Sequence, residues 1–79
     1  MLRLVTRLIN SEFDVSDEGQ DHESIEAASR AAILTAFDVA KGLYADGELD
    51  PRIEIRISEK RKVVARHFVT IAVRDLEER

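Results

Sequence analysis

The segment that decides the fold is residues 24–44, SIEAASRAAILTAFDVAKGLY. Its apolar residues recur at steps of three and four positions, which is typical of an amphipathic helix. Ser24 is a suitable N-cap, because its hydroxyl can accept a hydrogen bond from the free N–H groups of the first turn. Gly47 and Pro51 predict that the helix ends near Tyr44. The expected core-facing stripe is Ile25, Ala28, Ala32, Ala36, Val39 and Leu43, and a second stripe beside it is Ile33, Phe37, Ala40 and Tyr44.

Two strands are predicted after the helix. Residues 53–57, IEIRI, alternate apolar and charged side chains, which favours a strand with its isoleucines facing inward. Residues 63–73, VVARHFVTIAV, form the longest predicted strand, and SEKRK (58–62) is the charged hairpin loop between the two. Alternation places His67 and Phe68 on opposite faces. A β-bulge at this point would turn Phe68 rather than His67 toward the core, and the sequence leaves both possibilities open.

A hairpin is predicted before the helix. Residues 2–9, LRLVTRLI, alternate as a strand does, although one face of a helix also fits them. Asn10-Ser11 favours the strand, because it is a plausible two-residue turn that would place Leu8 opposite Phe13. The elements then follow the order ββαββ. This order predicts an α+β fold in two layers, with one helix packed on an antiparallel sheet. The order of the strands within the sheet stays open.

We expect residues 1–79 to form a single domain, since a chain of this length supports only one small core. Such a core contributes roughly 3–5 kcal/mol of net stability, so association with a second copy would help it. The final residues, 75–79, are expected to fray or to form one helical turn.

Short motifs accompany the predicted order of elements: DEG (17–19), IEAASRAA (25–32), IEIRI (53–57) and TIAVRDL (70–76). In these motifs the chain resembles a family of uncharacterised small bacterial ββαββ domains, a domain of unknown function. The chain departs from that pattern at SEKRK, where such domains more often have an acidic turn that contains glycine. The resemblance implies the fold and brings no catalytic residues with it.

Composition limits the classes of function. The chain has no cysteine, which fits a reducing compartment and excludes thiol chemistry and cysteine-based metal sites. No apolar run is long enough to span a membrane, and a cytoplasmic location is expected. The net charge of −4 disfavours nonspecific binding to nucleic acid. The charge is unevenly placed, however: residues 12–26 hold seven acids and no Lys or Arg, whereas residues 52–66 hold six bases and two acids.

The acidic segment raises the possibility of a cation site. Asp14, Ser16 and Glu18 could occupy the first ligand positions of a calcium loop, but the position that requires a bidentate glutamate falls on Ile25. The sequence therefore predicts neither a metal site nor a cofactor. Asp17-Glu18-Gly19 is interpreted instead as a tight turn in which glycine supplies a positive φ.

Catalysis is not expected either. His67 is a candidate general base, but the only other histidine is His22 in the acidic segment, and no nucleophile, base and orienting group can be named together. We therefore expect no catalytic residues, no enzyme activity and no small-molecule substrate.

The predicted functional surface is the sheet face that points away from the helix. It mixes apolar side chains with charges of both signs, which is typical of a patch that meets its own copy. We expect a non-enzymatic protein-interaction domain that self-associates as a homodimer, or else binds another protein through the same face. The alternative is a small nucleic-acid-associated regulator that uses the basic segment 52–66, which the overall acidity disfavours. The residues predicted for the interface are Val5, Ile9, Arg56, Val64, Arg66, Phe68 and Ala72.

Overall fold

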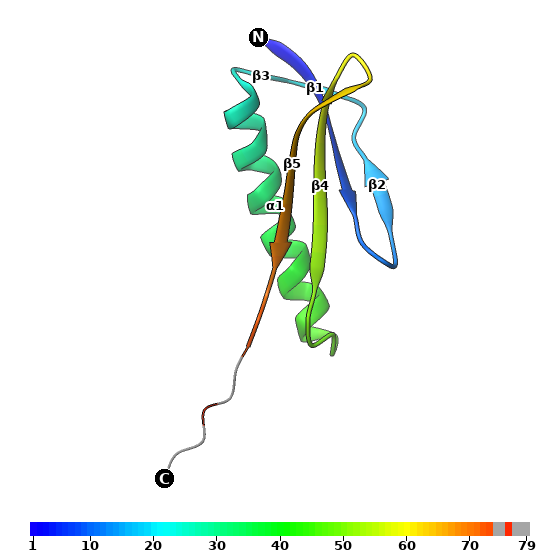
Figure 1. Ribbon diagram of the computed structural model, residues 1–79, viewed down its shortest axis with the longest axis vertical. Coiled ribbons are helices and arrows are strands. Elements are labelled where there is room, and N and C mark those ends of the chain that lie inside the picture. Colours follow the sequence, from blue (N-terminus) through cyan, green and yellow to red (C-terminus); the bar gives the residue numbers. More distant parts are fainter. Residues whose placement is uncertain (74–75, 77–79) are drawn as a thin grey trace.

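One helix packs across one face of an antiparallel sheet in the computed structural model, which describes residues 1–73 and 76 (Figure 1). The described sheet has the strand order β2-β1-β4-β5, and β3 also pairs with β1. The predicted two-layer α+β class is confirmed, but the order ββαββ is corrected to β-β-β-α-β-β. The elements are β1 (Leu2–Ile9), β2 (Asp14–Ser16), β3 (Gln20–His22), α1 (Ile25–Ala45), β4 (Arg52–Glu59) and β5 (Lys62–Thr70).

The additional strand arises because one edge strand is split at Asp17. The Asp17 backbone N–H donates to the Thr6 carbonyl at 3.0 Å, as in a regular ladder. The Thr6 N–H, however, donates to the Asp17 carboxylate at 3.1 Å, and so does the Gly19 N–H at 2.9 Å. The side chain thus takes the place of a backbone carbonyl, and pairing with β1 resumes one residue out of register at Gln20. The predicted turn is confirmed, with Gly19 at φ +98°.

The first hairpin turns more widely than predicted. Ile9 pairs with Asp14, so the loop has four residues, and Leu8 pairs with Val15 rather than with Phe13. The Asn10 side-chain oxygen accepts from the Glu12 N–H at 2.7 Å, which stabilises the wider loop by an Asx-type turn. Because the register differs from the predicted one by two residues, each side chain of β2 keeps its face of the sheet.

The helix begins and ends as predicted. The Ser24 hydroxyl accepts from the Ala27 N–H at 3.0 Å, and Gly47, at φ +107°, donates to the Tyr44 carbonyl at 3.0 Å. Alanines recur every fourth position against the sheet, which lets the helix backbone lie close to it. Of the second stripe only Ala40 is buried, Ile33 is half-buried, and the other two side chains are exposed. The buried alanines are Ala28, Ala32, Ala36 and Ala40.

The core lies between these alanines and the central strands. Ile53, Ile55 and Ile57 of β4 are fully buried, as their alternation predicts. The β4–β5 connection is tighter than the predicted loop, because Lys60 and Arg61, both at positive φ, form a two-residue turn. Leu4 and Leu8 from β1 and Val69 from β5 complete the buried cluster.

A bulge in β5 lies near its start and not at His67. Ile57 pairs with Ala65 whereas Ser58 pairs with Val63, so Val64 is the additional residue. Beyond the bulge the pairing is regular: His67 lies opposite the buried Ile55, and Phe68 opposite Glu54 on the other face. The possibility that a bulge turns Phe68 toward the core is therefore wrong.

β5 ends at Thr70, three residues before the predicted end of the strand. The prediction for residues 75–79 lies, except at Leu76, outside the described residues. Within residues 1–73 and 76, no helix is both long enough and apolar enough to cross a bilayer.

Candidate interaction surface

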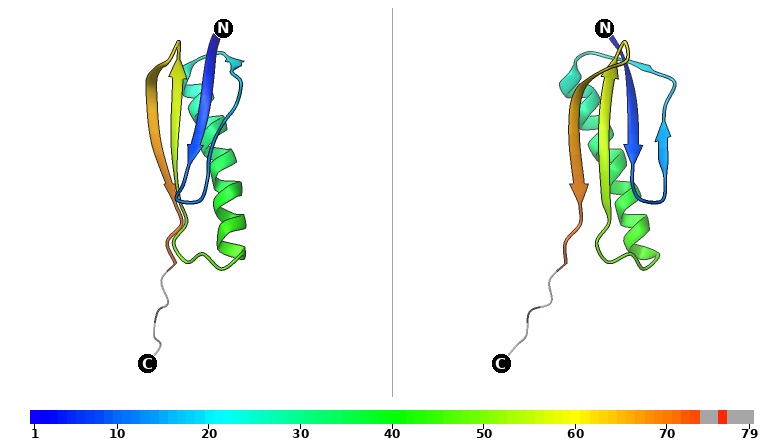
Figure 2. Two further views of the ribbon diagram at one scale, coloured as in Figure 1. Left: turned by 90° about the vertical axis from the view of Figure 1, so that its right-hand side faces the viewer. Right: turned by 45° about the vertical axis from the view of Figure 1, so that its right-hand side comes forward.

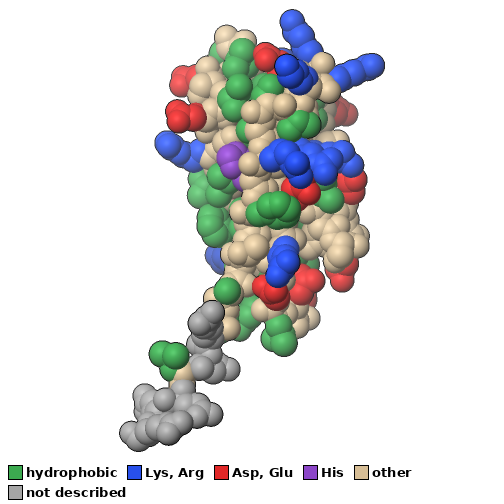
Figure 3. Space-filling model, viewed as in Figure 1, with side chains coloured by type: hydrophobic (Ala, Val, Ile, Leu, Met, Phe, Trp, Pro, Cys, Tyr) green, Lys and Arg blue, Asp and Glu red, His purple; other side chains and the backbone are tan. Residues whose placement is uncertain are grey.

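The sheet face that points away from α1, which we call the open face, carries rows of charged side chains. Arg7, Arg56 and Arg66 lie side by side on β1, β4 and β5, because Arg7 pairs with Arg56 and Arg56 with Arg66. The next row, toward the end of β5, places Glu54 between Ile9 and Phe68. Figure 3 shows this face, with basic side chains lying across the middle of the sheet and acidic ones beside them.

Ion pairs connect these two rows. Arg56 Nε and Arg66 Nη2 donate to the same Glu54 oxygen at 2.5 and 3.0 Å, and Arg7 forms a two-point contact with Asp14. The hydrogen bond from Arg56 lowers the pKa of Glu54 below its ordinary value, and the hydrogen bond from Arg7 does the same for Asp14. The row of arginines is therefore largely compensated by carboxylates within the same face.

The structure brings together only part of the predicted interface. Arg56, Arg66 and Phe68 are neighbours on β4 and β5. Phe68 and Ala72 line one shallow hollow with Thr70, so these two predicted residues also lie together. Phe68 is 67% exposed. The exposed apolar area of the open face is thus greatest along β5.

The remaining predicted residues lie apart from that area. Val5 and Ile9 are half-buried on β1, and β4 separates them from β5. Val64, at the bulge, is half-buried and packs against the core cluster.

β5 presents an unpaired backbone edge, because within the described residues it pairs with β4 alone. In an antiparallel pair, residues alternate between bonding to the neighbour through both backbone groups and pointing both groups away. The Ile71 N–H donates to the Pro51 carbonyl at 3.3 Å, so the odd-numbered residues after the bulge bond toward β4. The N–H and C=O groups of Arg66, Phe68 and Thr70 therefore point outward from the sheet.

A groove of about 450 Å³ runs between this edge and α1. Its apolar walls come mainly from Ile25, Ile33 and Leu34, and Leu34 is 61% exposed. Phe37, one helical turn after Ile33, adds another exposed apolar side chain on the same flank of the helix. Figure 3 shows apolar side chains gathered at this margin of the molecule, beside a histidine side chain.

We group these features under one name, the edge surface. It consists of the outward backbone of Arg66–Thr70, Phe68 above it on the open face, and Ile33, Leu34 and Phe37 below it on α1. Sequence reasoning missed the helical part. The second apolar stripe of the helix contained the signal, but the strand that it flanks cannot be identified without the strand order.

His67 faces the same groove and shares a hydrogen bond of 2.9 Å between its Nε2 atom and the Ser29 hydroxyl. A hydroxyl in contact with an imidazole is the first requirement for nucleophilic catalysis. Ser29 is only 8% exposed, however, and among the described residues no carboxylate is hydrogen-bonded to His67. The contact satisfies two polar groups at the edge of the core.

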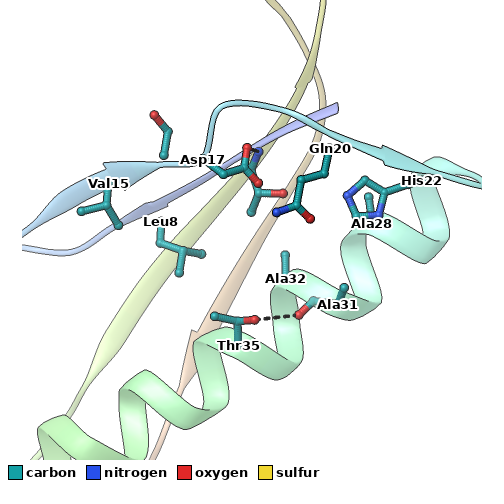
Figure 4. Close-up of a pocket in the computed structure, with 11 residues that line it drawn as sticks. Leu8, Val15, Asp17, Gln20, His22, Ala28, Ala31, Ala32 and Thr35 are labelled. Carbon is teal, nitrogen blue, oxygen red and sulfur yellow. Dashed lines mark hydrogen bonds between the residues drawn. The ribbon is translucent and has the colours of Figure 1, made fainter. Parts of the chain in front are cut away.

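A second groove, of about 350 Å³, lies on the opposite side of α1 beneath the split edge strand (Figure 4). Leu8, Val15 and the helix alanines form its walls, while Gln20 and His22 extend toward the helix from β3. The His22 Nε2 atom is buried without a hydrogen-bond partner in the described part of the chain.

In the acidic segment beside this groove, the Asp17 carboxylate has a structural role. One oxygen of the Asp17 carboxylate is already committed to two backbone N–H groups. Across residues 1–73 and 76, no group of three or more His, Cys, Asp or Glu side chains is arranged to hold a metal ion.

No family model, curated protein or solved structure matches the chain. The resemblance to small bacterial domains of unknown function therefore stays a prediction.

Proposed function

We propose that the protein is a non-enzymatic protein-interaction domain that self-associates as a homodimer through the edge surface. A single observation carries this proposal: the outward backbone of β5 lies between exposed apolar side chains of both layers, Phe68 on one side and Leu34 and Phe37 on the other. An unpaired strand edge is a template for pairing with another chain. Apolar side chains on both sides of it would be buried by the same contact.

The edge surface supports the proposal better than the full interface predicted from the sequence. On the open face, Glu54 and Asp14 already bind the three arginines of the central row, and Val5 and Ile9 are half-buried. A partner placed there would have to desolvate these ion pairs, which is costly. We therefore retain Arg66, Phe68 and Ala72 in the proposed interface and centre it on β5.

Nucleic-acid binding is the weaker alternative. The row Arg7, Arg56 and Arg66 favours it, because aligned arginines can bind phosphates. Two observations weigh against it: carboxylates occupy the same face, and the net charge is −4. We propose the cytoplasm as the location, since the chain lacks cysteine.

The test is the solution mass by light scattering at low and at high salt. The expected result is a dimer under both conditions, because apolar and backbone contacts depend little on ionic strength. A dimer at low salt alone would instead indicate pairing of the acidic and basic segments, and a monomer throughout would contradict the proposal.

A matched pair of variants locates the interface. Phe68→Asp should shift the mass toward the monomer while the circular dichroism of the helix is unchanged. Val15→Asp is the control, because Val15 is also an exposed apolar residue, 54% accessible, but lies at the opposite edge of the sheet. It should leave the dimer intact. Equal effects of the two substitutions would exclude the β5 edge.

A further inference from the structure

We infer that two copies pair antiparallel along residues 66–70 of β5, with the two-fold axis at Phe68, so that the two sheets become continuous. This inference rests on the proposed self-association and specifies its geometry. Phe68 would lie opposite Phe68 of the second copy, and Arg66 opposite Thr70.

The outward backbone groups limit the possible registers. Within the described residues, only Arg66, Phe68 and Thr70 in the regular part of β5 have N–H and C=O groups that point away from β4 without a partner, so these residues must form the hydrogen-bonded pairs of the new ladder. These three residues occupy every second position of the strand. Each must lie opposite another residue whose backbone groups also point away from its own sheet, and only a few symmetric registers meet this condition.

The side chains and the bulge then decide between these registers. A centre at Arg66 would place two arginines directly opposite each other, which is destabilising. A centre at His67 would oppose two imidazoles and would extend the pairing onto Val64, where the bulge disrupts the strand. A centre beyond Phe68 loses pairs, because β5 ends at Thr70. The centre at Phe68 uses the whole regular stretch and brings no like charges into direct opposition.

The same register suits the helix layer. On the sheet face that carries α1, Val69 of the second copy would lie opposite His67, above the groove that Ile25 and Ile33 line. Figure 2 shows α1 crossing behind the sheet obliquely, close to β5 at its N-terminal end and away from it at its C-terminal end. The exposed flanks of the two helices, including Leu34 and Phe37, would therefore face each other beneath the joined strands.

Cysteine cross-linking tests the register, because the chain has no cysteine of its own. Arg66→Cys and Thr70→Cys are made as separate chains that differ in mass, then mixed, allowed to exchange and mildly oxidised. Opposed residues of a hydrogen-bonded pair have Cα atoms about 5.5 Å apart, within the range that a disulfide spans. Two cysteines at position 66 would be about 13 Å apart, which is beyond it.

The expected result is at least about tenfold more disulfide-linked dimer in the mixture than in either variant alone. Cross-linking of Arg66→Cys by itself would overturn the Phe68-centred register in favour of a centre at Arg66. Absence of cross-linking in the mixture, with a dimeric mass by light scattering, would overturn the register and leave self-association standing. A monomeric mass for the unmodified chain would overturn the proposed function itself.

Discussion

The two edges of the sheet differ in the length and the regularity of their strands. The edge formed by β2 and β3 consists of two three-residue strands separated by the turn at Asp17–Gly19, and acidic side chains flank it. The opposite edge, β5, is a nine-residue strand with one bulge at Val64. Short strands, charges and bulges are the devices by which proteins prevent edge-to-edge association. The edge formed by β2 and β3 combines short strands and acidic side chains with a register shift at Asp17–Gly19, whereas β5 is long and regular from Ala65 to Thr70, with its bulge confined to Val64.

This difference favours β5 over the edge formed by β2 and β3 as an edge for strand pairing. At the edge formed by β2 and β3, the Asp17 side chain takes the place of a backbone carbonyl toward β1 and the register shifts by one residue, so this edge is not one continuous strand. At β5, the outward backbone is intact and exposed apolar side chains lie in both layers beside it. The same sheet thus has one edge that is closed to pairing and one that is open.

Two proline variants of neighbouring residues in β5 should have the largest and most contrasting effects. Val69→Pro removes an N–H that bonds toward β4 and also a buried side chain, so we expect a largely unfolded protein, since a core of this size contributes only roughly 3–5 kcal/mol. Thr70→Pro removes an outward N–H at the end of the strand, so the monomer should fold but fail to dimerise. Circular dichroism and light scattering measure the two properties. Loss of fold in both variants would show that the outward assignment is wrong.

At the closed edge, Asp17→Ala should destabilise the protein by about 1–3 kcal/mol, because the Thr6 and Gly19 N–H groups lose their acceptor. Urea denaturation measures the free energy of unfolding. Asp21→Ala serves as the control, since Asp21 is exposed and only weakly paired, at 3.9 Å from Arg3. A similar small effect of both substitutions would mean that Asp17 does not hold the split strand.

Gly19→Ala tests the turn that breaks this edge, and we expect a loss of about 1 kcal/mol from its positive φ. Gly47→Ala is the matched variant at the end of the helix, with a similar φ and no atom within 4 Å of the added carbon. At Gly19 the nearest atom is the Nε of the Arg3 side chain, which can move away. Thermal denaturation should therefore give similar losses, and a much larger loss at Gly19 would indicate crowding by its neighbours.

The smallest expected effect concerns the ion pairs of the open face. The folded-state pKa values of Glu54 and Asp14 lie below the ordinary values of these residues. The two ionised carboxylates therefore contribute their full stabilisation at pH values above the ordinary pKa, and this contribution is lost as the pH falls through the folded-state pKa. Glu54→Gln should therefore reduce the difference in urea midpoint between about pH 6 and about pH 3. An unchanged difference would show that Glu54 does not contribute.

The strongly periodic elements could be predicted from the sequence. The helix, its serine cap and the isoleucine strand depend on local patterns and on burial, and these patterns agree with each other. The wider first loop and the split strand could not be predicted, because they depend on where the side chains of Asn10 and Asp17 place single hydrogen bonds. The bulge at Val64 has no glycine or proline to mark it.

The candidate surface was predictable only in part. Alternation places Phe68 on the open face and groups it with Arg56 and Arg66, but it does not show which strand lies at an edge. The exposed helix flank at Phe37 can be assigned to this surface only once β5 is known to lie beside it. Strand order depends on contacts between distant segments, which a single sequence does not display.

Amide hydrogen exchange resolved by residue, at protein concentrations above and below the dimer dissociation constant, tests the difference between the two edges most directly. We expect the amides of Arg66, Phe68 and Thr70 to exchange slowly at high concentration and rapidly at low concentration. The amides of Asp14 and Ser16, which point outward from β2 by the same alternation, should exchange rapidly at both. Equally rapid exchange of all five amides at every concentration would contradict self-association through the β5 edge.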